Sequence, residues 1–330
     1  MLRLPAFTYE GAATIAQAVD LLARYGPDAL PVSGGTDLYA NMKQRLFTPK
    51  VLVGLRSIPQ MRFISYDETN GLEIGALTTL RTIAEHAIVN THYRALARSA
   101  SLVSTPQLRS MGTIGGNVCL DTRCSFYNQD AGWREALGYC MKKGGEICRV
   151  APGSSRCLAV NSSDLVPVLH AFDATIHLAG IAGNRTVEIA KFYRDDGRCA
   201  LAIAPGEIVT KITIPPARSH TRSAYRKLRL RESFDFPLLG IAAVLRLDDE
   251  GICRDARLVL SAVGPRPLDV VGAQAVLIAS RLEPAAIEAA ADQAFVLGKP
   301  MENVSTSLLY RKRMLRIFAR RTLEDAASQV

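Results

Sequence analysis

The stretch that decides the organisation of this chain opens with Thr113-Ile114-Gly115-Gly116-Asn117 and closes with Asn161-Ser162-Ser163-Asp164. Between these motifs lies a segment without helical or strand periodicity, and it holds Cys124, Cys140, Cys148 and Cys157, four of the chain's seven cysteines. Glycine permits unusual backbone angles and close approach, so the first motif is suited to bring backbone N–H groups against an anion. The stretch therefore predicts an anion-binding turn beside a loop with redox or metal chemistry.

Length and composition describe an ordinary globular chain. With 330 residues, of which 48% are hydrophobic and 22% charged, it is long enough for two or three domains. The segment Met1–Pro5 lacks the apolar region of a signal peptide, and no apolar run reaches the roughly 18 residues of a membrane span. We therefore expect a soluble, cytoplasmic protein. Cysteines in that reducing compartment favour metal or redox chemistry over structural disulfides.

The net charge of the chain is +9, from 40 basic and 31 acidic residues. Such a charge suits an anionic cofactor, an acidic protein partner or solubility alone. We expect no nucleic-acid binding, since the sequence has neither an RNP-type aromatic box nor zinc-finger spacing of Cys and His. It also lacks the motifs of serine hydrolases and zinc proteases, and its five histidines are scattered.

The pattern of hydrophobic residues divides the chain into three expected parts. Residues 1–59 combine a helix, opened by a capping box at Thr14, with short strands and a glycine-rich turn. Residues 60–216 alternate strands and helices around an inserted loop at about 122–162. Residues 217–330 have three strands followed by two helices.

The boundaries of these elements follow from turn residues and caps. Expected strands span 29–32, 51–53, 63–66, 72–76, 175–178, 186–189, 207–214, 224–230, 241–247 and 256–263. Expected helices begin near Leu80 and span about 93–103, 284–297 and 308–327. The last helix is expected to present a basic face formed by Arg311, Lys312, Arg313, Arg316, Arg320 and Arg321.

A second glycine turn, Ser33-Gly34-Gly35-Thr36, lies between an expected strand and an expected helix. The N-terminus of a helix favours an anion, although most turns of this kind bind nothing. The presence of a second Gly-Gly motif at Thr113–Asn117 favours a shared phosphate site. The chain has no GxGxxG fingerprint and no GxxxxGK[ST] P-loop, so a bound dinucleotide would not sit in a Rossmann fold.

These motifs together resemble the FAD-binding subunits of the molybdenum hydroxylases, the family of xanthine dehydrogenase and the carbon monoxide dehydrogenase medium chain. The resemblance continues at Asp164–Leu169, where the family has an acidic residue near the ribose or adenine side of the flavin. It continues again at Ala224–Lys227 with Phe234–Pro237, where the basic residue near the flavin falls.

The resemblance implies an α+β fold, with a two-subdomain FAD-binding fold of the vanillyl-alcohol-oxidase (PCMH) type. A smaller C-terminal α+β domain of the CO dehydrogenase flavoprotein type would follow. No catalytic residue is expected on this chain, whose role would be to bind and orient cofactors. The FAD site would be formed by Val32, Ser33, Gly34, Gly35, Thr36, Asp37, Leu38, Thr113, Gly115, Gly116, Asn117, Asp164 and Lys227.

The inserted loop departs from most of this family, which passes almost directly from the GGN motif to the Ser-Asp motif. Its cysteines, Cys124, Cys140, Cys148 and Cys157, are separated by 15, 7 and 8 residues. Four thiolates can hold zinc or an iron–sulfur cluster, but structural zinc sites usually show paired C-x2–4-C knuckles, and none occurs here. The wide spacing therefore favours a [4Fe-4S] cluster with these four ligands.

Other residues near the loop have less specific signals. Cys119 is a fifth candidate ligand but follows the glycine motif directly, and we expect it to be buried. Cys199 and Cys253 are isolated and are expected to be structural. Trp133 is either a hydrophobic plug that shields the cluster or an ordinary packed aromatic residue.

The insert itself resembles that of the flavoprotein subunits of the 4-hydroxybenzoyl-CoA reductases, which carry an additional [4Fe-4S] cluster. This resemblance implies that electrons pass from ferredoxin to the loop cluster, then to FAD and to partner chains. The chain has neither C-x4-C-x2-C spacing nor a molybdopterin domain, so a [2Fe-2S] small subunit and a molybdopterin-binding large subunit must supply those centres. A dimer of heterotrimers, not attached to a membrane, is expected.

Two rival functions stay open at this level. The chain could be the FAD subunit of an NAD-linked molybdenum hydroxylase whose cysteine loop holds structural zinc. It could also be a non-enzymatic, metal-stabilised assembly subunit in which the glycine turns bind nothing. Flavin and iron–sulfur absorption bands separate these three possibilities.

Overall fold

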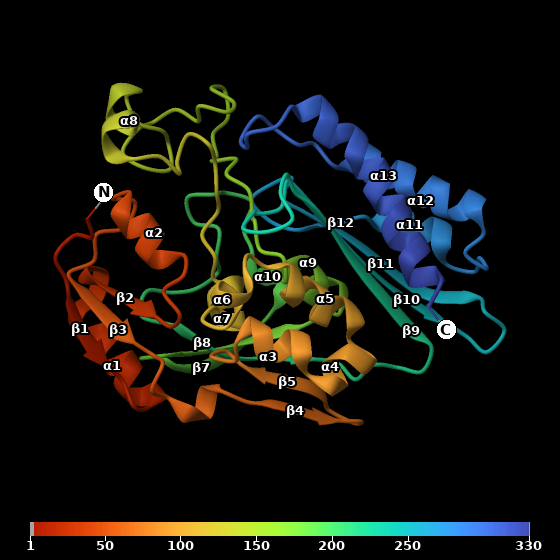
Figure 1. The fold of residues 1–330 in the computed structure, drawn as a ribbon, viewed down its shortest axis with the longest axis horizontal. Coiled ribbons are helices and arrows are strands. Elements are labelled where there is room, and N and C mark those ends of the chain that lie inside the picture. The colour runs from red at the N-terminus through yellow and green to blue at the C-terminus, as the bar shows by residue number, and fades with distance from the viewer. Residues whose placement is uncertain (1–2, 330) are drawn as a thin grey trace.

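Three separate β-sheets form the frame of the protein in the computed structural model, which describes residues 3–329 (Figure 1). The first sheet has the strand order β1-β3-β2, the second β4-β5-β8-β6-β7 and the third β12-β11-β10-β9. A division of the chain at residues 59/60 and 216/217 stays a prediction. Within the described residues, no helix is both long and apolar enough to cross a bilayer.

The first sheet is small and parallel. Its strands are β1 (Thr8–Gly11), β2 (Ala29–Val32) and β3 (Val51–Gly54), and both outer strands pair with β3. The crossover helix α1 (Ile15–Tyr25) begins at the expected cap, where the Thr14 side chain accepts from the Gln17 N–H. It ends at Gly26, whose φ of 53° favours glycine. The glycine turn after β2 leads into the short helix α2 (Leu38–Lys43).

The second sheet is antiparallel and carries helices on the side of the glycine motifs (Figure 1). Its strands are β4 (Ile64–Asp67), β5 (Gly71–Gly75), β6 (Thr175–Gly180), β7 (Gly183–Glu188) and β8 (Ile208–Ile214). Short helices fill the connections: α3 (Leu80–Glu85), α4 (Ala87–His92), α5 (Arg94–Leu102), α6 (Pro106–Arg109), α7 (Ile114–Val118), α8 (Ala131–Ala136), α9 (Val166–Ala171) and α10 (Ile189–Phe192). Two 3₁₀ turns lie at Gly26–Asp28 and Pro59–Met61.

The third sheet is antiparallel, and three C-terminal helices cover it (Figure 1). Its strands are β9 (Thr221–Leu228), β10 (Leu239–Leu247), β11 (Cys253–Ser261) and β12 (Leu268–Asp269). The helices are α11 (Val271–Leu277), α12 (Pro284–Leu297) and α13 (Leu308–Ala327). The expected bounds of α12 and α13 are confirmed. This part has its own hydrophobic core, separate from the core of the second sheet.

Several expectations for local structure are wrong. The motif Thr113–Asn117 is not a turn but the start of α7, capped by the Thr113 side chain, which accepts from the Gly116 N–H. The cysteine segment contains one short helix, α8, although the sequence shows no period there; Asp130 caps it through the Trp133 N–H. Because a helix this short has fewer than two turns, it leaves almost no periodic signal.

The expected basic face of α13 is also partly wrong. Arg311 is completely buried, and its guanidinium donates to the carbonyls of Leu238, Met301 and Ala262. Arg316 and Arg320 form ion pairs with acidic side chains of α12, such as Glu288. One basic side chain of this helix therefore holds the C-terminal part together from inside, and two others are paired with carboxylates.

The cysteine segment forms an arm that leaves the sheets and lies between α2 and the C-terminal helices (Figure 1). Hydrogen bonds fix both sides of this position. The buried Arg134 donates to the carbonyl of Gln44 at 3.0 Å, directly after α2. On the other side, the Ser125 N–H donates to the carbonyl of Asn303 at 2.9 Å.

Candidate functional site

The two glycine motifs lie in direct contact although eighty positions separate them. The hydroxyls of Ser33 and Thr113 are 3.0 Å apart and share a hydrogen bond. A Cβ atom on Gly34 would stand 2.0 Å from the Met111 carbonyl oxygen. On Gly115 it would lie 2.8 Å from the Ala76 side chain. These glycines are therefore required because two backbone segments approach too closely for any side chain.

The first glycine turn also presents free hydrogen-bond donors. Within residues 3–329, the backbone N–H groups of residues 34–37 donate to no protein acceptor. Gly35 has a φ of 67°, which turns successive amides in a way that few other residues permit. Consecutive free amides in such a turn form a concave anion site. The chain's own residues therefore fit a phosphate group at this turn.

Asp37, directly after the glycine turn, connects this site to the cysteine arm. Its carboxylate accepts from the Asn41 side chain at 2.7 Å and from the Arg123 guanidinium at 3.1 Å. Burial raises the pKa of Asp37, and the positive charge of Arg123 opposes this shift. The same guanidinium lies 4.0 Å above the centre of the Phe236 ring. Arg123 thus contacts the first glycine turn, the C-terminal part and, through its neighbour Cys124, the cysteine site.

Asn117, at the end of the second glycine motif, holds the Ser-Asp motif. Its side-chain oxygen accepts from the Ser163 hydroxyl at 2.5 Å and from the Leu165 N–H at 3.4 Å. Asp164 lies between these two residues and is 2% exposed. The expected residues Asn117 and Asp164 are therefore brought together, close to α7.

Asp164 and Lys227, both expected near the flavin, form a buried ion pair. The ammonium of Lys227 lies 2.8 Å from one carboxylate oxygen of Asp164, and the Tyr225 hydroxyl donates to the other at 2.7 Å. Lys227 also donates to the Leu102 carbonyl at 3.1 Å. Burial raises the pKa of Asp164, while the charge of Lys227 and both hydrogen bonds lower it. The roles of these two residues at the flavin stay a prediction.

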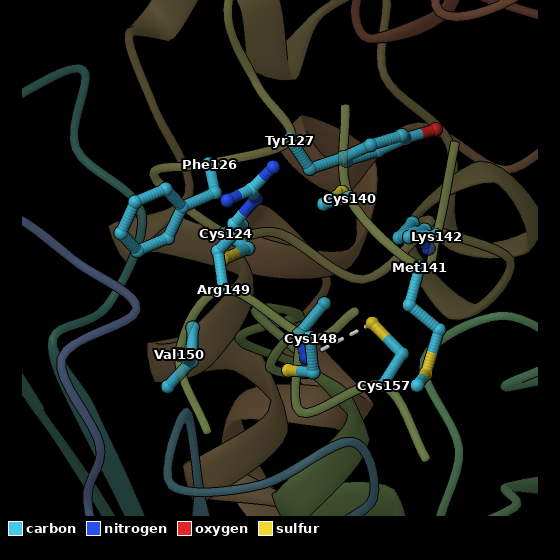
Figure 2. A pocket seen from close by; sticks show the side chains of 11 residues that line it. Cys124, Phe126, Tyr127, Cys140, Met141, Lys142, Cys148, Arg149, Val150 and Cys157 are labelled. Atoms are coloured by element: carbon cyan, nitrogen blue, oxygen red, sulfur yellow. Dashed lines mark hydrogen bonds between the residues drawn. The ribbon is translucent and has the colours of Figure 1, made fainter. Parts of the chain in front are cut away.

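The four expected cysteine ligands surround one pocket (Figure 2). The pocket has a volume of about 260 Å³, including space open to solvent, and each of the four side chains is at most 8% exposed. Phe126, Tyr127 and Met141 also line it. The burial of Cys124 raises its pKa to about 12, and the nearby thiols add to this shift. The aperiodic arm thus brings together side chains that lie far apart in the sequence.

This arrangement differs from that of a site for a single ion. Among residues 3–329, no group of three or more His, Cys, Asp or Glu side chains is close enough to hold one metal ion. Tetrahedral zinc draws four sulfurs to about 2.3 Å from one centre, whereas a cubane cluster binds each thiolate at a separate iron, so its ligands stand further apart. The four thiols that share the pocket are a donor set that either zinc or an iron–sulfur cluster can use.

The surroundings of the cysteines are tightly fixed. Lys142 lines the pocket, and its ammonium is 2.7 Å from both the Asp121 carboxylate and the Thr122 hydroxyl. A Cβ atom on Gly197 would lie 2.9 Å from the Cys157 sulfur. Cys157 itself donates through its N–H to the Asp196 carboxylate at 3.1 Å. Residues from outside the arm therefore define the position of this sulfur.

The remaining cysteines do not join the site. Cys119 is half-buried, so the expectation that it is buried is only partly met. Cys253 is fully buried in β11, as expected of a structural residue, but Cys199 is exposed, and a structural role for it is wrong. The Trp133 side chain is 38% exposed, so it is not a buried plug over the pocket.

A second, larger pocket adjoins Cys124. It has a volume of about 790 Å³, including space open to solvent, and lies between the arm and the C-terminal part. Arg123, Ser162 and the segment 235–238 contribute to its walls. The residues Phe234–Pro237, expected near the flavin, are therefore close to the first cysteine of the arm.

Sequence reasoning missed several residues that define these sites. Tyr225, Gly197, Asn303 and Arg311 were not expected to contribute, because each acts through a partner distant in sequence. Gly197 follows two aspartates in an unpatterned segment, and Asn303 lies between two helices. Neither position carries a local signal.

The comparisons with known proteins agree with this architecture. Residues 5–217 match the family described as the FAD binding domain in molybdopterin dehydrogenase. Residues 223–326 match the CO dehydrogenase flavoprotein C-terminal domain. The expected fold class is therefore confirmed: an α+β FAD-binding domain of the PCMH type followed by a smaller C-terminal domain.

Individual relatives match along almost their entire length. The aldehyde oxidoreductase FAD-binding subunit PaoB of Escherichia coli (strain K12) is 30% identical over 94% of this chain and 96% of its own. The carbon monoxide dehydrogenase medium chain of Afipia carboxidovorans is 30% identical over 98% and 97%. In the crystal structure of the cyanide-inactivated Cu,Mo-CO dehydrogenase, one chain superposes with a TM-score of 0.81 at 28% identity, covering 99% of this chain and 100% of that one.

The buried pair of Asp164 and Lys227 generates a stability prediction. Lys227→Met should lower the free energy of unfolding by about 3 kcal/mol or more, because it leaves a carboxylate buried without its cation. The double variant Asp164→Asn with Lys227→Met should recover much of this loss. Denaturant unfolding of the three proteins measures both effects.

The same variant should show a defined pH dependence. Without Lys227, the pKa of Asp164 in the folded state rises further above its unfolded value, so the folded state binds the proton more tightly. The stability of Lys227→Met should therefore increase as the pH falls from above the raised pKa of Asp164 to the ordinary range of carboxyl groups, and it should level off below that range. If Lys227→Met and the double variant lost the same free energy of unfolding at every pH, this result would contradict an ionised pair.

Proposed function

This chain belongs to the FAD-binding subunits of the molybdopterin dehydrogenases, and we propose that it transfers electrons between a [4Fe-4S] cluster on its cysteine arm and FAD. The observation that carries the proposal is the position of Arg123. It contacts the first glycine turn through Asp37 and is followed directly by Cys124 of the cysteine pocket. Two sites suited to redox cofactors are thus joined through adjacent residues.

The FAD pyrophosphate would bind at the contact between the two glycine motifs. The free amides of residues 34–37 would donate to it, while Gly115 and Gly116 keep the second motif close. Asp164 and Lys227 would stabilise the flavin side of the site through their ion pair. Bound FAD supplies the ability to accept two electrons and pass them on singly.

The cluster would be held by Cys124, Cys140, Cys148 and Cys157, each supplying one thiolate. The four side chains line one pocket and are each at most 8% exposed, which supports this ligand set. The protein's part is to fix the four sulfurs, exclude most solvent and keep the pocket apolar, which together tune the potential of such a cluster.

The partners follow from the family and from the inserted arm. A molybdopterin-binding large subunit and a [2Fe-2S] small subunit would complete a heterotrimer, and its dimer would be the full assembly. From the resemblance of the arm we propose that ferredoxin would be the electron donor and 4-hydroxybenzoyl-CoA the substrate on the large subunit. There, two electrons and two protons would remove the phenolic hydroxyl as water and leave benzoyl-CoA.

The glycine site generates a prediction for FAD binding. A Cβ atom on Gly116 would lie 3.3 Å from the Thr113 hydroxyl and 3.6 Å from that of Ser33, so a side chain there reaches the contact between the motifs without a severe clash. Gly116→Asp should lower FAD affinity at least about tenfold, since it places a carboxylate beside the pyrophosphate. The measurement is FAD per chain after gel filtration, with circular dichroism to show that the chain is folded.

The matched control for this variant is Gly153→Asp, which adds the same charge to the arm. A Cβ atom on Gly153 meets nothing within 4 Å. This control should retain FAD as the wild type does. Equal FAD content in Gly116→Asp and Gly153→Asp would contradict the pyrophosphate site.

The cysteine pocket generates a prediction for metal content. The chain, purified anaerobically, should contain about four irons and four acid-labile sulfides. Replacing Cys124, Cys140, Cys148 or Cys157 with Ser should lower both, because each thiolate is one ligand, while Cys199→Ser should change neither. Four irons in Cys140→Ser would remove that residue from the ligand set. Zinc in the wild type would instead favour the NAD-linked hydroxylase with a structural zinc loop.

The close contact at Gly197 generates an independent test of the pocket geometry. Gly197→Ala should lower iron content, because the added methyl would lie 2.9 Å from the Cys157 sulfur and 3.0 Å from Ala159 and must displace one of them. Gly153→Ala makes the same chemical change where the space is empty and should keep full iron. Iron and sulfide analysis of both variants decides the matter. Full iron in Gly197→Ala would show that Cys157 does not need its present position.

A further inference from the structure

The two outer cysteines of the arm are connected through one residue of the C-terminal part. Asn303 lies between α12 and α13 and is 1% exposed. Its backbone carbonyl accepts from the N–H of Ser125 at 2.9 Å, and its side-chain amide donates to the carbonyl of Leu158 at 2.8 Å. Ser125 directly follows Cys124, and Leu158 directly follows Cys157. One asparagine therefore bridges the chain next to the first and the last of the four cysteines.

Asn303 is itself held from inside the C-terminal part. Its side-chain oxygen accepts from the buried Arg311 at 3.3 Å, which fixes the orientation of the amide group toward Leu158. Arg311 also donates to the Met301 carbonyl at 2.8 Å and the Leu238 carbonyl at 2.9 Å. These bonds leave Asn303 little freedom to rotate or shift.

The inner two cysteines are held differently. The carbonyl of Cys140 accepts from the N–H groups of Lys143 and Gly145 at 2.8 and 3.0 Å, and Met141 donates to Ile147 at 2.9 Å. These bonds join residues of the arm to one another. Cys140 and Cys148 therefore belong to a unit that the arm forms by itself, whereas Cys124 and Cys157 receive support from another part of the protein.

We propose that Asn303 is a positioning residue that sets the separation of Cys124 and Cys157 for the group bound between the four thiols. The proposal rests on the cluster function proposed above. It adds that the C-terminal part, and not the arm alone, determines the geometry of the cysteine site. Among the described residues, Asn303 forms no hydrogen bond with a thiol and acts through the backbone beside two of them.

Two variants separate the two contacts of this residue. Asn303→Ala removes the amide donor, its acceptor for Arg311 and the packing of the side chain. Asn303→Asp keeps the acceptor for Arg311 and the backbone carbonyl for Ser125, but it places an oxygen opposite the Leu158 carbonyl. The matched control is Gln329→Ala, since Gln329 is a side-chain amide that bonds the backbone of Ser223 at 2.8 Å, away from the arm.

The first measurement is amide hydrogen exchange of the complete chain, which does not depend on iron. In Asn303→Asp, exchange should accelerate about fivefold or more across residues 157–160, as expected for one lost hydrogen bond. The Ser125 amide should stay protected in that variant, because its acceptor is the backbone. In Asn303→Ala both regions should accelerate, whereas Gln329→Ala should leave both unchanged.

The second measurement concerns the loaded chain. Iron release to a chelator should be about fivefold faster or more in Asn303→Ala and Asn303→Asp than in Gln329→Ala, with FAD content unchanged. The electron paramagnetic resonance spectrum of the reduced Asn303→Asp chain should change in shape and not only in intensity. A merely structural defect would lower the amount of cluster without altering its spectrum.

The outcomes distinguish this proposal from the function on which it rests. Unchanged exchange at residues 157–160 in Asn303→Asp overturns the positioning role, whatever the chain binds. Altered exchange with an unchanged spectrum and unchanged iron release also overturns it. A wild-type chain without iron overturns the cluster function instead, and the exchange pattern then still decides whether Asn303 sets the positions of the two cysteines.

Discussion

The ion pair between Asp164 and Lys227 is the interaction on which the arrangement of both sites depends. Asp164 belongs to the segment that Asn117 holds beside α7, and Lys227 belongs to β9 of the C-terminal sheet. A paired charge of this kind, almost without exposed surface, is costly to separate because each ion has lost its water. The C-terminal sheet is therefore fixed against the glycine motifs, and everything attached to that sheet is fixed with it.

The cysteine arm contains little regular secondary structure and depends on contacts with the fixed parts of the protein. Ordering each backbone residue costs about 1–2 kcal/mol in conformational entropy, and an aperiodic segment has no repeating hydrogen bonds to offset that cost. In this protein contacts from outside the arm add to its few internal hydrogen bonds: Gln44 contacts Arg134, Gly197 lies against Cys157, and Asn303 bridges the two ends. The arm can therefore carry an apolar, thiol-lined pocket with the short helix α8 as its one helix among the described residues.

Sequence patterns predicted the elements that rely on local signals. The bounds of α12 and α13 are correct, since both are long and α12 begins with Pro284 at its first turn. The glycine motifs and the four cysteines were identified, because glycine spacing and clustered cysteines are visible in the sequence, and the structure places each set together. The burial of Arg311 was missed, because an arginine on a helix is usually solvated and its carbonyl partners lie in distant loops. Asn303 and Gly197 were missed for the same reason: their roles exist only after distant segments have packed together.

The bridge at Asn303 also has a consequence for biosynthesis. The ribosome completes the arm long before it reaches the segment between α12 and α13, and Arg311 is added later still. At about 5–20 residues per second, the thiols would wait on the order of ten to thirty seconds before their outer anchors exist. During that interval the nascent arm is an unsecured thiol-rich segment, open to oxidation and to the wrong metal. We therefore expect loading of the cysteine site to follow synthesis of the segment that contains Asn303 and Arg311, so that maturation factors meet an arm with both outer anchors in place.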